Sequence, residues 1–260
     1  MRAIYFIRSL LYVLICTASI SLYILVCVLC FPLPVSTRYK ITMAWPKFST
    51  WFASWFLGIR WQKKGWDNIP DTPCIILAKH QSAWETCFLP GYFPHELCFV
   101  YKRELNWLPF FGWGLALLDM IAINRSRGSE AFEQIVTQGR RKAAEGRWVI
   151  FFPEGTRTLP GAYKPYKTGG ARLALRLGMP VLPIAINSGE CWPRNAFIKT
   201  PGTITVSVGP IIRPEGHTME SLTQATEDWI EAEMRVLAPH RYADAAAPGT
   251  RAQPVAAAGR

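Results

Sequence analysis

The sequence predicts an α/β domain, with a mixed sheet flanked by helices, behind an N-terminal membrane-anchoring helical segment. Two observations predict this architecture. No charged residue occurs from Ser9 to Thr37, which leaves an apolar run long enough to cross the hydrocarbon core of a bilayer. Beyond Trp66, short apolar runs alternate with segments of helical periodicity, as is typical of helices packed on a sheet.

The first segment, residues 1–66, is predicted to anchor the protein to a membrane. A signal peptide would have a shorter apolar region and a small-x-small cleavage site, which "CFPLPVSTRY" does not contain, so we expect the segment to be retained. The stretch Met43–Trp61 is aromatic but is interrupted by Pro46 and Lys47, which suits the membrane interface better than its core. A single span and a two-helix hairpin inserted from one side both remain open.

Basic residues surround this segment unevenly. Arg2 and Arg8 precede the apolar run, whereas a larger group follows it: Arg38, Lys40, Lys47, Arg60, Lys63 and Lys64. Because positive charge accumulates on the cytoplasmic side of membrane proteins, the remainder of the chain is expected on the cytoplasmic face.

Residues 67–240 are predicted to form the α/β domain, and the Ala-, Pro- and Gly-rich residues 241–260 to be disordered. Helices are predicted over Ser129–Glu145, from about Gly169 to a C-cap at Gly178, and over about Met219–Leu237. Six apolar runs are predicted as strands: Cys74–Ala78, Leu97–Tyr101, Met120–Ile123, Trp148–Phe152, Val181–Ile186 and Thr203–Val208.

The composition limits the classes of partner that the protein is expected to bind. The net charge of +11 and the eleven tryptophans favour an anionic partner and a membrane interface. No nucleic-acid-binding motif is present, and much of the positive charge lies beside the apolar N-terminus, so anionic lipid is the expected partner and nucleic acid is not. The seven scattered cysteines do not form a disulfide or metal-binding pattern, and we expect them to be reduced.

His80 and Glu85 form a candidate catalytic pair in "KHQSAWET", directly after a predicted strand. A histidine is the usual base for an alcohol near neutral pH, and a carboxylate can fix its tautomer. Five residues on one helix would leave the two side chains about 140° apart. They can therefore meet only if His80 precedes the helix and Glu85 lies in its first turn, with Ser82 as a possible N-cap.

Other polar residues follow predicted strands in the same way. Glu154 and Arg157 come after Trp148–Phe152, Arg125 follows Met120–Ile123, and Lys102 follows Leu97–Tyr101. Ligands of open α/β sheets bind at the carboxyl ends of the strands, and arginine binds phosphate with two parallel hydrogen bonds. We therefore expect these loops to converge on one crevice; Lys167 is interpreted as a solvated charge.

Four ordered blocks of the sequence resemble the glycerolipid acyltransferases, and most closely the lysophosphatidic acid acyltransferases. The blocks are "KHQSAWE", "GLALLDMIAINR", "FPEGTR" and "VLPIAIN". The third matches the family motif letter for letter, whereas Glu85 stands where the family usually has aspartate. The resemblance covers roughly residues 74–190 and implies a glycerol-phosphate-acyltransferase-like fold and a place in the bacterial inner membrane.

The resemblance also implies roles for the candidate residues. His80, oriented by Glu85, would take the proton from the hydroxyl of lysophosphatidic acid, and the product would be phosphatidic acid. Arg125 and Arg157 would hold the phosphate, Glu154 with Gly155 would shape the acceptor site, and Lys102 is a further basic candidate. The acyl donor would be a thioester of coenzyme A or of acyl carrier protein, with no cofactor and no metal.

Three alternatives compete with this interpretation. The same chemistry could act on glycerol-3-phosphate or on another lysophospholipid. A serine hydrolase with Ser82 as nucleophile lacks the G-x-S-x-G elbow. A non-enzymatic membrane or nucleic-acid adaptor would account for the charge alone.

Overall fold

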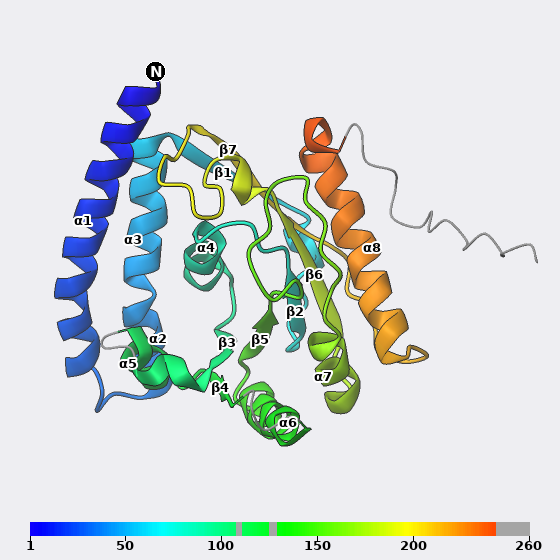
Figure 1. The fold of residues 1–260 in the computed structure, drawn as a ribbon. Coiled ribbons are helices and arrows are strands. Elements are labelled where there is room, and N and C mark those ends of the chain that lie inside the picture. Colours follow the sequence, from blue (N-terminus) through cyan, green and yellow to red (C-terminus); the bar gives the residue numbers. More distant parts are fainter. Residues whose placement is uncertain (108–110, 125–128, 243–260) are drawn as a thin grey trace, which may run out of the picture.

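The computed structural model describes residues 1–107, 111–124 and 129–242 (Figure 1). Arg125, one of the predicted phosphate-binding residues, lies outside these ranges.

A mixed sheet forms the centre of the described part of the chain. Its seven strands follow the order β1-β7-β6-β2-β5-β3-β4. Neighbouring strands are parallel except for the antiparallel pair β6 and β7. The bounds are β1 (Ile59–Lys64), β2 (Ile75–Ala78), β3 (Leu97–Lys102), β4 (Ile121–Ile123), β5 (Trp148–Phe151), β6 (Val181–Ile186) and β7 (Gly202–Val208).

Helices cover both faces of this sheet, as Figure 1 shows. They are α1 (Arg2–Leu29), α2 (Val35–Thr42), α3 (Ala44–Phe52), α4 (Trp84–Tyr92), α5 (Phe111–Leu117), α6 (Ser129–Ala144), α7 (Gly169–Leu177) and α8 (Met219–Leu237). A π-helical turn, Ala53–Leu57, continues α3, and a capping box between Thr218 and Ser221 starts α8.

Two apolar cores lie on opposite faces of the sheet. Along β2, Ile76 packs into the core shared with α1, α3 and α4, whereas Ile75 and Leu77 pack into the core shared with α6 and α7. Every residue of β2 is buried. A strand covered on both faces reads as a continuous apolar run, which explains why "IILA" shows no alternation.

The helix α1 lies beside α3 in Figure 1 and contacts the rest of the chain at several points along its length. Ser9 accepts a hydrogen bond from the backbone N–H of Lys199, Tyr12 bonds Ser49, and Trp45 Nε1 donates to Ser19. Its other face is apolar and open to solvent, with Leu22 and Leu29 69% and 79% exposed. This helix is long and apolar enough to span a membrane, and its exposed face suits lipid.

The predicted elements are present with small shifts at their ends. The six predicted strands differ from the observed ones by at most one residue at either end, and α7 ends at its predicted cap, Gly178. The strand β1 was not predicted: Ile59–Lys64, assigned above to the anchoring segment, pairs with β7 at the edge of the sheet. Only Ile59 of this strand is buried, so "IRWQKK" carries little apolar pattern.

Candidate active site

Three neighbouring parallel strands bring the candidate residues to one edge of the sheet. The strand β2 lies between β5 and β6 and is parallel to both. His80 follows β2, Glu154 follows β5, and Ser188 follows β6. Carboxyl ends of parallel strands meet at the same edge, so the loops that carry these residues lie together.

His80 and Glu85 are in contact. His80 lies in the connection before α4, and Glu85 lies in the first turn of that helix, so the geometry expected from their spacing is present. His80 Nδ1 is 2.9 Å from Glu85 Oε1. A carboxylate only accepts, so Nδ1 carries the proton and Nε2 is left with the lone pair that a general base needs.

The carboxylate of Glu85 is fully buried and fixed by several donors. Besides the imidazole, Oε1 accepts the backbone N–H groups of Gln81 and Ser82 at 2.8 and 2.7 Å. Ser188 donates its hydroxyl to Oε2 at 2.6 Å. Hydrogen bonds of this kind stabilise a buried negative charge that water cannot reach.

The imidazole of His80 is held from a second side by an aromatic ring. It stacks on Phe152 with ring centroids 4.0 Å apart, and its side chain keeps 15% of its surface exposed. The Glu85 contact and the Phe152 stack together fix the plane of the ring. The remaining exposure leaves room for a reactant to approach.

The Ser82 hydroxyl bonds the backbone at the start of α4. The residue is fully buried, and its Oγ accepts the backbone N–H of Trp84 at 3.0 Å. The N-cap position belongs to Ala83, which makes no side-chain cap bond, so the expectation of Ser82 as the N-cap was wrong by one residue; its hydroxyl instead binds the first helical N–H from one position earlier. This geometry argues against Ser82 as the nucleophile of a hydrolase.

Glu154 lies under the histidine loop. It is fully buried, and its carboxylate accepts the backbone N–H of His80 at 3.2 Å and an ion pair from Lys79 at 3.1 Å. The structure does not favour the expectation that Glu154 bonds the acceptor directly, because the carboxylate has no exposed surface. Its contacts join the loop after β5 to the loop after β2.

Lys79 is a buried residue that the sequence did not single out. Its ammonium also pairs with Glu231 of α8 at 2.5 Å, and Tyr166 donates to the same Glu231 oxygen at 2.9 Å. Burial acts to lower the pKa of Lys79, but Glu154 and Glu231 outweigh it and raise the pKa, so the lysine stays charged. Through Glu231, helix α8 therefore helps to hold the loop that carries Lys79 and His80.

The other predicted residues lie around the same loops. Gly155 has a φ of +69°, and a Cβ there would come within 2.8 Å of Lys167 Nζ. Lys102 is exposed at the end of β3, and Arg157 is partly exposed. Gly155 and Lys102 both line the cavity described next, whereas Lys167 is exposed, as expected.

An apolar cavity of about 770 Å³ is lined by His80, by strand β3 and by the N-terminal helices. Its walls come from α1, from the α2–α3 junction, from α4, from β3 and from α5. Its lining includes Ile24, Trp45, Pro90, Phe99, Leu118 and Phe152. A cavity of this size with a mainly apolar lining suits an apolar ligand.

Comparison with known proteins identifies the family. A family model described as Acyltransferase matches residues 60–187. A 1-acyl-sn-glycerol-3-phosphate acyltransferase of Pseudomonas aeruginosa is 42% identical over 244 residues, which are 92% of this chain and 95% of that relative. The chain belongs to the acyltransferase family. The human 1-acyl-sn-glycerol-3-phosphate acyltransferase beta is 31% identical over 65% of this acyltransferase and 62% of its own length.

A solved structure shows that the fold is shared. The crystal structure of the 1-acyl-sn-glycerophosphate acyltransferase of Thermotoga maritima matches with a TM-score of 0.75 and 24% identity. The match covers 91% of this acyltransferase and 98% of the other chain. It includes the predicted combination of an apolar N-terminal helix with a mixed sheet.

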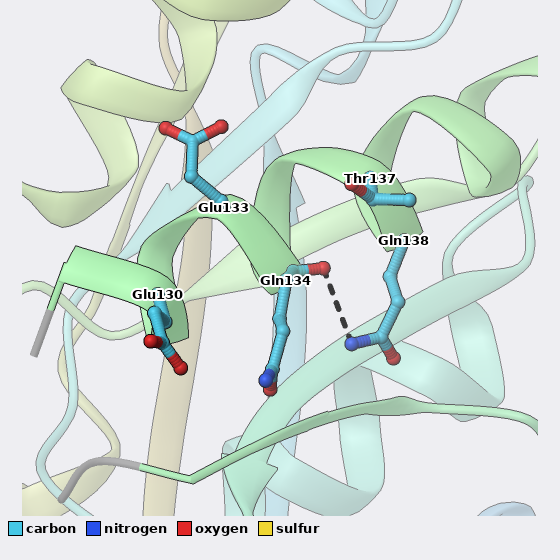
Figure 2. A pocket seen from close by; sticks show the side chains of 5 residues that line it. All are labelled: Glu130, Glu133, Gln134, Thr137 and Gln138. Atoms are coloured by element: carbon cyan, nitrogen blue, oxygen red, sulfur yellow. Dashed lines mark hydrogen bonds between the residues drawn. The ribbon is translucent and has the colours of Figure 1, made fainter. Parts of the chain in front are cut away.

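A second hollow of this acyltransferase lies along α6 (Figure 2). The residues that line it, Glu130, Glu133, Gln134, Thr137 and Gln138, do not line the cavity that contains His80. Gln138 donates to the carbonyl oxygen of Gln134 at 3.2 Å, an intrahelical contact. Within the described ranges, no group of three or more His, Cys, Asp or Glu is placed to hold a metal ion.

Proposed function

We propose that this acyltransferase moves an acyl chain from a thioester to the free hydroxyl of lysophosphatidic acid, giving phosphatidic acid in phospholipid biosynthesis. The relative named for that activity aligns over nearly the whole of both chains. The observation that carries the proposal is the His80–Glu85 contact in the wall of an apolar cavity. A base for a hydroxyl lies there beside a space suited to an acyl chain.

In this mechanism the Nε2 atom of His80 takes the proton of the acceptor hydroxyl. The hydroxyl oxygen attacks the thioester carbonyl carbon, a C–O bond forms, and the C–S bond breaks as the tetrahedral intermediate collapses. The proton then passes from His80 to the departing thiolate. Glu85 keeps Nδ1 protonated and stabilises the imidazolium that forms between the two transfers.

The acceptor phosphate is assigned to the basic residues around the crevice. Lys102 lines the cavity, and Arg157 is assigned here because it follows Gly155 by two residues in the loop after β5. Arg125 is proposed to join them because it follows β4 in the sequence, and β4 lies next to β3 in the sheet. Gly155 lines the crevice and allows close approach of a ligand to the backbone. For Glu154 we propose a supporting role through His80 and Lys79, since the buried carboxylate has no surface left for a ligand.

The acyl chain of the donor is assigned to the apolar cavity. Helix α1 forms part of its wall, so the anchoring segment and the substrate site share residues such as Ile20 and Ile24. An acceptor and a product that are both amphiphiles require access from a lipid surface. The donor is a thioester of coenzyme A or of acyl carrier protein.

We further propose that the catalytic domain lies on the cytoplasmic face of a bacterial inner membrane and contacts anionic lipid. The excess of basic residues after the apolar run supports this face. The contacts of Ser9, Tyr12 and Ser19 on α1 favour the two-helix hairpin, because a helix held against the domain by side-chain contacts is not free to cross a bilayer.

An acceptor and donor panel tests the proposal. The purified protein in phospholipid vesicles is offered lysophosphatidic acid, glycerol-3-phosphate and lysophosphatidylcholine, each with acyl-coenzyme A and with acyl carrier protein thioesters, and His80→Ala serves as the blank. We expect transfer to lysophosphatidic acid that the blank lacks. A clear preference for either of the other acceptors would reassign the substrate, and equal turnover by the blank would reject the mechanism.

A further inference from the structure

Ser188 lies at the active site, although it is not part of any of the four sequence blocks that predicted the site. It opens the short turn Ser188–Glu190, which a single residue separates from the end of β6, the strand that pairs with β2. The residue is fully buried and lies 103 positions from Glu85 in the chain. The pairing of Ala78 with Ile184 places this turn beside the loop that carries His80.

The hydrogen bonds to Glu85 are divided unequally between its two oxygens. Oε1 accepts from Gln81 N–H, from Ser82 N–H and from the imidazole. For Oε2, the one donor among the described residues is Ser188 Oγ, at 2.6 Å. This bond therefore sets how far the carboxylate can rotate and how much of its charge is neutralised on the side away from His80.

The turn that holds Ser188 is itself fixed by contacts away from Glu85. Gly189 N–H donates to Gln81 Oε1 at 3.2 Å, and a Cβ on Gly189 would come within 2.9 Å of Pro160. Glu190 pairs with Arg241 at 2.8 Å and with His240 at 3.0 Å. The Ser188 hydroxyl is thus presented from a rigid turn, as positioning of a catalytic carboxylate requires.

We propose that Ser188 is a positioning residue for acyl transfer, acting on His80 through Glu85; this inference rests on the proposed function. Its hydrogen bond keeps Oε1 aimed at Nδ1. It also draws negative charge toward Oε2, which weakens the attraction of the carboxylate for the imidazolium. Without the bond, Glu85 rotates more freely and stabilises the imidazolium more strongly, so His80 stays protonated to a higher pH.

Ser188→Ala tests this role, with Ser207→Ala as the matched control. Ser207 is also a buried serine that donates to a glutamate, Glu233, at 2.8 Å, but it lies on β7 and contacts no residue of the site described above. We expect kcat of Ser188→Ala to fall about tenfold, both KM values to change less than about twofold, and the acid limb of the pH–rate profile to move upward by about half a pH unit. Ser207→Ala should show none of these changes.

A double-mutant cycle separates positioning from general packing. In Glu85→Gln the charge is absent, so adding Ser188→Ala should cost less than about twofold, far below its effect in the parent. Independent, multiplying effects would overturn the proposal, as would a lower melting temperature with an unchanged pH profile. If Ser188→Ala fails to fold, Ser188→Cys keeps nearly the same volume with a weaker donor and should show the same shift of the profile.

An NMR titration of the histidines keeps the test independent of turnover. In protein labelled with ¹⁵N-histidine, the His80 resonances, assigned by their loss in His80→Ala, should titrate at higher pH in Ser188→Ala and be unchanged in Ser207→Ala. An unshifted titration overturns the inference whatever the substrate is. Failure of the proposed function would appear differently, as absent transfer to lysophosphatidic acid by the parent protein.

Discussion

Replacing Glu85 with glutamine removes one charge and leaves the shape of the site almost unchanged. The backbone N–H groups of Gln81 and Ser82 both point at Oε1, at 2.8 and 2.7 Å. An amide NH₂ in that place would face two donors, so the glutamine oxygen must take the position of Oε1. His80 then keeps its acceptor at Nδ1 and its tautomer, and the loss of the carboxylate charge is the main change.

The magnitude follows from the charge that develops on the imidazole. Two unit charges about 4 Å apart attract by about 4 kcal/mol at an effective dielectric constant of about 20, which suits a partly exposed histidine. If about half of the charge has formed in the transition state, the loss is about 2 kcal/mol, or about 30-fold in kcat. Loss of the tautomer is far more costly, about 10⁴-fold in a Ser-His-Asp triad.

The assay follows release of free thiol from acyl-coenzyme A in the presence of saturating lysophosphatidic acid. Melting curves of the same samples report folding. We expect Glu85→Gln to lose about 30-fold in kcat with little change in either KM. Glu85→Asp retains the charge but withdraws it by about 1.5 Å, the length of one C–C bond. Its kcat should therefore lie between those of the wild type and Glu85→Gln. Wild-type kcat in Glu85→Gln would refute the assignment of Glu85 as the group that supports the base.

Three further outcomes are expected. Gly155→Ala should lower stability by about 1–2 kcal/mol because of its positive φ, and should also raise KM for the acceptor by crowding the crevice; Gly216→Ala, with a φ of +79° and open space around it, should show the stability loss alone. Burial acts to raise the pKa of Asp119, but the lysine and arginine of α6 that it contacts outweigh this and lower it. Asp119→Asn should therefore be less stable by about 1–2 kcal/mol at pH 7 in urea denaturation, with the gap closing as the pH falls through the lowered pKa, since the aspartate then becomes neutral as well. The rings of Trp51 and Trp55 stack with centroids 6.2 Å apart, and the two residues are 55% and 69% exposed. Replacing both with serine should reduce flotation with anionic vesicles at least tenfold without lowering the melting temperature. Unchanged flotation would show that these rings do not contact the membrane.

Much of the site could be predicted because it depends on local order along the chain. His80 and Glu85 are joined by one strand-to-helix connection, so spacing and helical geometry were enough to predict that they could meet. The burial of Glu154 could not be predicted in this way. It depends on Lys79, which by sequence is a charge at the end of a strand and by structure is a buried partner of Glu231, 152 residues away.

The sequence by itself determined many of the helices and strands. Apolar runs and helical periodicity located six strands, the helices α6, α7 and α8, and the apolar N-terminal helix, because these patterns reflect which side of each element is buried. The tertiary structure alone decided how distant segments meet: that β1 joins the sheet beside β7, that α8 supplies a carboxylate to Lys79, and that Ser188 reaches Glu85. Strand order is set by the packing of the whole core, and a residue far along the chain carries no local pattern that reveals which strand will be its neighbour.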